Sequence, residues 1–183
     1  MLSLQETCPP HAIVVGNPAR IQGYSTTLIT DAQDAVGSEA AELNIKINVP
    51  RASVILMPTI TDLRGNLTFG EYGKELPFIP KRYFIVFDVP SKDVRGEHAH
   101  RDLHQLLVCV KGSCCVALDD GVNRDRVVLD TPAKGLYLPP MIWATQYKYS
   151  QDAVLLVLAS EKYDNADYIR DYDEFVGLIN INK

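Results

Sequence analysis

RGEHAHRDLHQLLVCVKG, residues 95–112, is the stretch that decides the fold of this chain. Residues two apart in an extended strand project from the same face, so His98 and His100 can point into one cavity while Ala99 faces the other way. The alternative is a pair of histidines packed in the interior and satisfied by their neighbours. Two imidazoles on one face, close to Arg95, favour a functional site over that alternative.

Short β-rich segments continue on both sides of this stretch. They alternate with turn signals such as Lys111-Gly112-Ser113, which is the spacing of an antiparallel sandwich or barrel. The predicted strands cover residues 45–49, 53–60, 66–69, 83–89, 105–112, 114–118, 126–129, 137–140 and 153–159. Helical periodicity is confined to residues 167–179, with Asp164 or Asn165 as the N-cap. The sequence predicts an all-β fold with one C-terminal helix on the outside, and we assign this acidic tail no catalytic role.

The composition excludes several classes of partner. A net charge of −5 disfavours a sequence-independent nucleic-acid binder, which needs clustered Lys and Arg. No apolar run approaches the ~20 residues of a membrane-spanning helix, and the N-terminus lacks the pattern of a secretory signal. The four cysteines include the adjacent pair Cys114 and Cys115 and show no C-x-x-C spacing, which favours reduced thiols. We expect a cytoplasmic protein whose partners include neither nucleic acid nor membrane.

The spacing within residues 95–112 resembles the first motif of the cupin superfamily, where two histidines and a glutamate bind a metal and a glycine follows. Gln105 stands where the glutamate would be, and Gly112 follows seven residues later. The second cupin motif resembles residues 135–144, and Ala144 occupies its histidine position. Because mononuclear metal sites usually need at least three good protein ligands, the loss of two of four argues against a metal. We expect a jelly-roll β-sandwich of the cupin type, with no metal and no other cofactor.

Further segments narrow the resemblance to one family. Residues 77–90, 95–100, 118–121, 135–143 and 163–173 resemble the dTDP-4-keto-6-deoxyglucose 3,4-ketoisomerases. Together they extend over nearly all of residues 46–183, which we take as one catalytic domain. The resemblance implies that the His-x-His pair serves the chemistry, that no metal takes part, that the ligand is a dTDP-linked keto sugar, and that the protein is a homodimer with exchanged strands.

The reaction of that family explains why two histidines are needed. Moving a ketone from C4 to C3 requires removal of the C3 proton and delivery of a proton to C4, through an enediol. An imidazole with a reference pKa near ~6.5 can accept and return a proton at neutral pH. Either His98 or His100 is expected to be the base on carbon, while the other assists proton transfer between O3 and O4. Arg95 either stabilises the enediolate or a phosphate, or is a solvated charge.

Other residues are candidates for substrate binding. Arg82 can form paired hydrogen bonds with phosphate oxygens, and Tyr83 follows it in the same predicted strand. Strand alternation puts these two side chains on opposite faces, so they do not line the cavity equally. Trp143 either stacks on the base or fills the core. Gln105 is a further candidate for substrate binding, whereas His104 is expected to be structural, in a turn or at the rim.

Residues 1–45 differ in character from the rest of the chain. Residues 9–20 resemble the closing segment of hexapeptide-repeat acyltransferases, and residues 26–42 are polar and alanine-rich, as in a linker. We therefore expect a protein fused to, or derived from, an N-acetyltransferase partner. A 3-keto sugar is the precursor of 3-amino sugars, so the expected setting is biosynthesis of a 3-acetamido-3,6-dideoxyhexose for surface glycans such as the lipopolysaccharide O-antigen.

Three alternatives stay open at the level of the residues. A sugar 3,5-epimerase is another cupin that removes a proton beside the same carbonyl group. A non-catalytic cupin would bind a sugar nucleotide and regulate or scaffold a partner protein. A metal-dependent oxygenase would carry stoichiometric iron or another transition metal.

Overall fold

The computed structural model of the protein describes residues 12–16, 20–24, 45, 47–90 and 92–181. By its internal contacts the chain divides into two compact units, residues 1–42 with 60–67 and residues 43–59 with 68–183. Most of the N-terminal tail and all of the linker predicted within residues 1–45 lie outside the described residues, so both stay predictions.

Two hairpins belong wholly or mainly to the first unit. In one of them, β1 (Ala12–Val15) pairs antiparallel with β2 (Arg20–Tyr24). In the other, β4 (Thr59–Asp62) is hydrogen-bonded to β5 (Gly65–Thr68). Gly65 has a φ of 123°, a conformation that glycine adopts without the steric cost of a side chain. This residue therefore allows the tight connection between β4 and β5.

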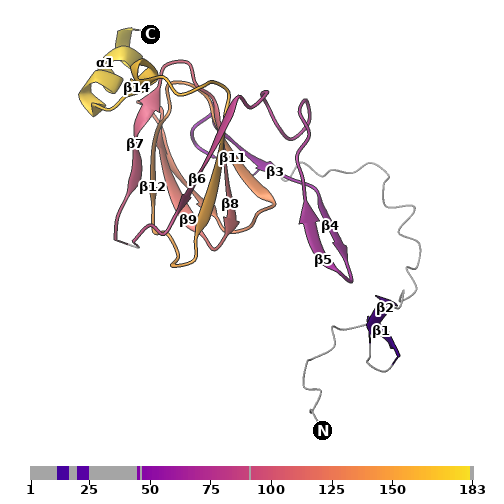
Figure 1. The fold of residues 1–183 in the computed structure, drawn as a ribbon. Helices are drawn as coiled ribbons and strands as arrows, with labels where there is room; N and C mark the ends of the chain where they lie inside the picture. Colours follow the sequence, from indigo (N-terminus) through magenta and orange to yellow (C-terminus); the bar gives the residue numbers. More distant parts are fainter. Residues whose placement is uncertain (1–11, 17–19, 25–44, 46, 91, 182–183) are drawn as a thin grey trace. The chain divides into compact units, whose positions relative to one another are not determined.

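The second unit contains a sandwich of two five-stranded sheets (Figure 1). One sheet has the order β10 (Arg124–Leu129), β9 (Cys114–Asp119), β12 (Trp143–Tyr147), β7 (Arg95–His100) and β14 (Tyr168–Ile169). The other has the order β3 (Ser53–Leu56), β11 (Lys134–Leu138), β8 (Gln105–Lys111), β13 (Val154–Ala159) and β6 (Arg82–Phe87). Neighbouring strands in both sheets run antiparallel. The predicted all-β sandwich is confirmed.

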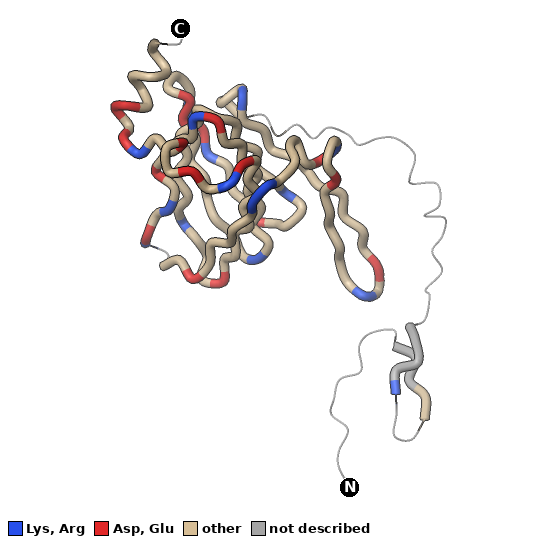
Figure 2. Tube along the Cα trace, turned by 45° about the horizontal axis from the view of Figure 1, so that its top comes forward, with Lys and Arg blue, Asp and Glu red and all other residues tan. Residues whose placement is uncertain are grey.

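The core lies between the two sheets, because alternate residues of each strand face inward. The fully buried side chains of this core include Leu107, Val116, Leu136, Leu155 and Val157. Strands β12 and β13 contain no charged residue, whereas β10 begins with Arg124, Asp125 and Arg126 (charged residues are coloured in Figure 2). Within the described residues, no helix has the length and apolar character needed to cross a membrane.

The predicted strands at the start of the domain need two corrections. Residues 45 and 47–49 are not in a strand, although Val49 is fully buried in the core. The predicted strand 53–60 is interrupted at Met57-Pro58, so that β3 ends at Leu56 and β4 begins at Thr59. Proline lacks a backbone N–H for the ladder, which explains the interruption.

The C-terminal segment also differs from the prediction. A helix starting near Asp164 is wrong, because residues Asn165–Asp167 form only a single 3-10 turn, η1, and α1 spans Tyr172–Ile181. Between these two elements, β14 pairs with β7, with Tyr168 opposite His100. The backbone groups of β14 are used in the ladder and are not free for helical hydrogen bonds. One face of α1 packs against Ala99 on the outer side of β7, as expected for an external helix.

Candidate functional site

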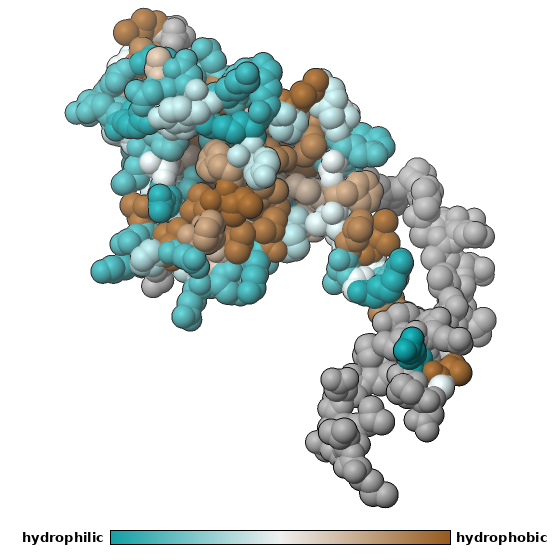
Figure 3. Space-filling model, in the orientation of Figure 1, coloured by the Kyte–Doolittle hydropathy of each residue, from teal (hydrophilic) through white to brown (hydrophobic). Residues whose placement is uncertain are grey.

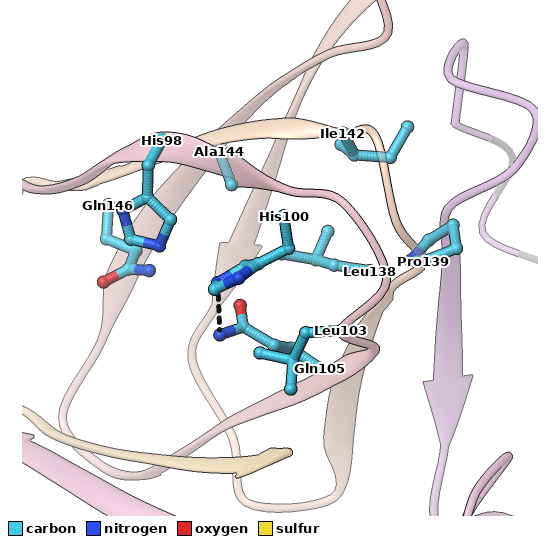
Figure 4. A pocket seen from close by; sticks show the side chains of 9 residues that line it. All are labelled: His98, His100, Leu103, Gln105, Leu138, Pro139, Ile142, Ala144 and Gln146. Atoms are coloured by element: carbon cyan, nitrogen blue, oxygen red, sulfur yellow. Dashed lines mark hydrogen bonds between the residues drawn. The ribbon is translucent and has the colours of Figure 1, made fainter. Parts of the chain in front are cut away.

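A small cavity lies between the sheets, and its polar side chains come from three strands (Figure 4). His98 and His100 extend into it from β7, Gln105 from β8 and Gln146 from β12. The remaining lining residues are Leu103, Leu138, Pro139, Ile142 and Ala144. The two imidazole rings are 4.9 Å apart between centroids and almost perpendicular, at 89°. The predicted shared cavity for these rings is therefore present.

A β-bulge in β7 sets the direction of His98. Across the ladder Ala144 pairs with His98, and Thr145 pairs with Gly96, so that Glu97 is the extra residue. Gly96 and Glu97 both have positive φ, 83° and 56°. A Cβ on Gly96 would lie 2.6 Å from the carbonyl oxygen of Ala144, so only glycine fits there.

The hydrogen bonds of each imidazole define its tautomer. His98 Nδ1 lies 2.8 Å from the carbonyl oxygen of Gly96, an acceptor, so Nδ1 carries the proton. His100 Nδ1 lies 2.7 Å from Asp167 Oδ2 and donates to that carboxylate in the same way. Gln105 Nε2 lies 3.3 Å from His100 Nε2 and donates to its lone pair. For His98 Nε2 the described residues provide no hydrogen-bond partner, so its lone pair is free on the cavity side.

Burial keeps both imidazoles neutral. It lowers the pKa of His98 below 6.5, which the Gly96 carbonyl opposes and the nearby charge of Arg170 reinforces. The pKa of His100 falls to about 4, again chiefly because of burial, although the hydrogen bond to Asp167 acts in the opposite direction. At neutral pH both rings are therefore proton acceptors rather than cations.

Two site residues lie in the acidic C-terminal tail, which was expected to have no catalytic role. Asp167 binds His100 through Oδ2, while its Oδ1 accepts a hydrogen bond from the backbone N–H of Asp102 at 2.7 Å. The ring of Tyr168 lies 4.9 Å from that of His98 and 4.3 Å from that of His100, between centroids. Sequence reasoning missed both because a strand of two residues is too short to show alternation.

The predicted substrate-binding residues of β6 separate as strand alternation requires. Arg82 lies on the inner face, with its guanidinium 5.3 Å from the ring centre of Phe84 and 5.5 Å from that of Tyr163. Its charge contributes to the lowered pKa of His100. Its Nε is buried and has no hydrogen-bond partner in the described part of the chain. Tyr83 lies on the outer face and is 68% exposed, which excludes it from this cavity in the single chain.

The other predicted residues lie away from the cavity. Arg95 is exposed at the start of β7 and does not line the cavity. Trp143 lies on the outer face of β12, with its ring centre 5.2 Å from that of Tyr172 and 5.7 Å from that of Phe175, so packing is the role that the structure supports. His104 Nδ1 bonds to the Tyr137 hydroxyl at 2.7 Å, outside the cavity, consistent with a structural residue.

The donor set of the cavity does not fit the cupin metal site. Ala144, at the position of the missing histidine, faces the cavity directly opposite His98 and offers only a methyl group. Gln105 offers a neutral amide whose nitrogen is directed at His100. Among the described residues, no group of three or more His, Cys, Asp and Glu could hold a metal ion. The two imidazoles are thus left without a third strong ligand.

Comparisons with known proteins assign this arrangement to a family. The family model described as "FdtA: WxcM-like, C-terminal" matches residues 50–180. This chain belongs to that family. Over 133 residues it is 46% identical to a TDP-4-oxo-6-deoxy-alpha-D-glucose-3,4-oxoisomerase of Aneurinibacillus thermoaerophilus, covering 71% of the present chain and 96% of the relative.

Solved structures of family relatives agree with this assignment. A 3,4-ketoisomerase from Helicobacter canadensis has a TM-score of 0.69 at 38% identity, covering 71% of this chain and 98% of its own. A His-to-Asn mutant of the 3,4-ketoisomerase QdtA from Thermoanaerobacterium thermosaccharolyticum, in complex with TDP-4-keto-6-deoxyglucose, has a TM-score of 0.69 at 35% identity, with 71% and 94% coverage. The predicted resemblance to the ketoisomerase family is confirmed.

Proposed function

We propose that this protein converts TDP-4-keto-6-deoxyglucose to its 3-keto isomer through an enediol intermediate. The observation that carries the proposal is the pair of neutral imidazoles, 4.9 Å apart, in one cavity of a chain that belongs to this family. Relatives at 46% and 35% identity carry the name 3,4-oxoisomerase or 3,4-ketoisomerase, which supports the same reaction here.

The reaction is balanced without an external oxidant or reductant. A base takes the proton from C3, the C3–H electron pair forms the C3=C4 double bond, and the carbonyl pair moves to O4. The proton of the O3 hydroxyl is then transferred to O4, which leaves the negative charge on O3. The O3 electron pair forms the carbonyl at C3 while the C3=C4 pair takes the proton back from the base at C4. Substrate and product are isomers, because C3 is oxidised from alcohol to ketone while C4 is reduced from ketone to alcohol.

We assign the proton transfer at carbon to His98 and the transfer between the oxygens to His100. His98 Nε2 has a free lone pair on the cavity side, whereas His100 Nε2 accepts a hydrogen bond from Gln105. Asp167 keeps the proton of His100 on Nδ1. The lone pair of His100 Nε2 can therefore accept a hydrogen bond from a substrate hydroxyl in place of the one from Gln105. Gln105 and Tyr168 would then contact the sugar beside the two rings.

Binding of the diphosphate is assigned to Arg82. The Nε of this arginine is buried without a protein partner, and a buried polar group normally has one. A phosphate oxygen would supply the missing acceptor in the geometry that a guanidinium favours. Arg95, exposed at the start of β7, is a secondary candidate for binding the same diphosphate.

The reaction is proposed to need no metal. Proton abstraction beside a carbonyl needs a base and a group that stabilises the oxyanion, and both can be side chains. With an amide at position 105 and a methyl group at position 144, the two imidazoles keep their lone pairs for protons.

A homodimer is proposed from an exposed apolar face. Tyr83, Ile85 and Phe87 on the outer side of β6 are 68%, 47% and 59% exposed, and Figure 3 shows a hydrophobic patch over this part of the sheet. In the β4–β5 hairpin, Ile60 and Leu67 are 55% and 56% exposed. A second copy that exchanges this hairpin would cover apolar side chains that a monomer leaves in water.

The proposed setting is cytoplasmic synthesis of a 3-acetamido-3,6-dideoxy sugar for surface glycans such as the O-antigen. The described cysteines Cys109, Cys114 and Cys115 are all free thiols, as is usual in a reducing compartment. A 3-keto product would next be aminated at C3 and N-acetylated, which agrees with the acyltransferase-like residues 9–20.

NMR of the product tests the proposal. TDP-4-keto-6-deoxyglucose is incubated with the protein, and the carbonyl carbon is assigned before and after the reaction. The expected result is loss of the C4 ketone signal and appearance of a C3 ketone. A ketone that stays at C4 with inverted neighbouring centres would identify an epimerase, and an unchanged sugar that still binds would identify a binding protein.

A further inference from the structure

Gln146 is a buried cavity residue that the sequence analysis did not single out. It extends inward from β12, is 8% exposed, and lines the cavity together with His98. Figure 4 shows its amide beside the imidazole of His98, with the nitrogen on the cavity side. Among the described residues, the hydrogen bond of this amide is made by its oxygen, and its nitrogen has no acceptor.

A buried tyrosine fixes the orientation of this amide. Tyr149 is 2% exposed, and its hydroxyl donates to Gln146 Oε1 at 3.1 Å. A buried phenol must donate its proton, and Gln146 Oε1 is the acceptor that the structure provides for it. Burial raises the pKa of Tyr149 above its usual value, so this donor stays protonated throughout the physiological range. With the oxygen held, the NH₂ group must face the cavity.

The bulge in β7 lies beside the NH₂ group. A Cβ on Gly96 would lie 3.4 Å from Gln146 Nε2, at ordinary van der Waals distance, so the amide is next to the bulged backbone. The same bulge aims His98 Nε2 into the cavity. His98 and Gln146 therefore both line the cavity beside this one backbone feature.

We infer that Gln146 is a catalytic residue that donates an N–H to O4 while negative charge develops there, and that Tyr149 is the positioning residue for its amide. This inference rests on the proposed function. When His98 removes the C3 proton, the carbonyl electron pair moves to O4, and a fixed donor in a buried site stabilises that charge more than it stabilises the ketone. The amide gains and loses no proton, so the balance of the reaction is unchanged.

Substitution of Gln146 tests the donor. Q146M keeps the length of the side chain without a donor, and its kcat is expected to fall about 100-fold while KM and TDP binding stay within about threefold. Q146E keeps an oxygen for Tyr149 and is expected to lower kcat at least as much, because it presents an anionic oxygen to the enediolate. Q151M, at an exposed glutamine outside the cavity, is the matched control and should retain full activity.

A double-mutant cycle tests the positioning role of Tyr149. Y149F is expected to lower kcat about fivefold in the native chain, because the amide can then turn its oxygen toward the cavity, and to have no further effect in Q146M. An additive loss would overturn the role of Tyr149. Thermal melting of each variant separates misfolding from lost catalysis.

Two outcomes separate this inference from the function on which it rests. Wild-type protein that forms the 3-keto sugar, together with a Q146M or Q146E kcat within threefold of wild type, would overturn the role of Gln146 and leave the function intact. Wild-type protein that forms no 3-keto sugar would overturn both.

Discussion

Strand β7 and the segment η1–β14 both supply the cavity, but they do so in different ways. β7 contributes His98 and His100, two imidazoles that both carry their proton on Nδ1. The C-terminal segment contributes Asp167, which holds one of those rings, and Tyr168, which packs against both. The reactive groups and the groups that orient them thus come from segments about 70 residues apart in the sequence. Only the reactive groups form a short sequence motif.

Removal of the proposed carbon base on β7 should give the largest effect. H98N is expected to lower kcat by about 10³-fold, because an amide cannot accept the C3 proton. Steady-state kinetics by NMR or coupled assay measures the loss. H104N is the matched control, since His104 lies outside the cavity and bonds to Tyr137. Equal activity of H98N and wild type would remove His98 from the chemistry.

Stability against pH should reveal the burial of His100. The pKa of His100 is about 4 in the folded chain and 6.5 when solvated. Between these two pH values the imidazole is therefore protonated in the unfolded chain but neutral in the folded chain. The free energy of unfolding should therefore fall as pH decreases from about 6.5 to about 4, by up to about 3 kcal/mol from this group. Urea titrations at several pH values measure the fall. If the free energy of unfolding of H100N falls with pH as much as that of wild type, His100 is not the source of the pH dependence.

Asp167 tests the contribution of the C-terminal segment to the site. In D167N, the side chain can donate to His100 Nδ1 as well as accept, so the proton can move to Nε2, where it blocks proton uptake. We expect kcat to fall about 30-fold with little change in KM, which points to an altered tautomer rather than lost binding. The ¹⁵N chemical shifts of His100 report the tautomer directly. A normal tautomer with reduced kcat would mean that Asp167 acts in another way.

The difference between β7 and the η1–β14 segment also explains which features could be predicted from the sequence. The shared cavity of His98 and His100, and the opposite faces of Arg82 and Tyr83, follow from strand alternation, which is a local property. The sandwich follows from the repeated pattern of short strands and turns.

Other features could not be predicted because they depend on contacts between distant segments. Asp167 reaches His100 only because Tyr168 and Ile169 add to the edge of β7. Gln146 lies in a strand, β12, that was not predicted, since Trp143–Tyr147 mixes polar and aromatic residues without clear turn signals on both sides. The residue type of Trp143 suits both stacking and packing, and it is the position of α1 against its ring that decides for packing.

The smallest effect is expected where β7 and the C-terminal helix meet at the surface. Arg101, immediately after β7, forms an ion pair with Glu174 of α1 at 2.5 Å, and the two side chains are 40% and 47% exposed. Exposed pairs contribute little because water and salt screen them, so E174Q should destabilise the fold by about 0.5 kcal/mol or less, with kcat unchanged. Urea unfolding at low and high salt measures this value. A much larger loss, accompanied by reduced kcat, would show that α1 holds Asp167 and β14 in place through this contact, and would make the C-terminal segment a single unit with the strand that carries the chemistry.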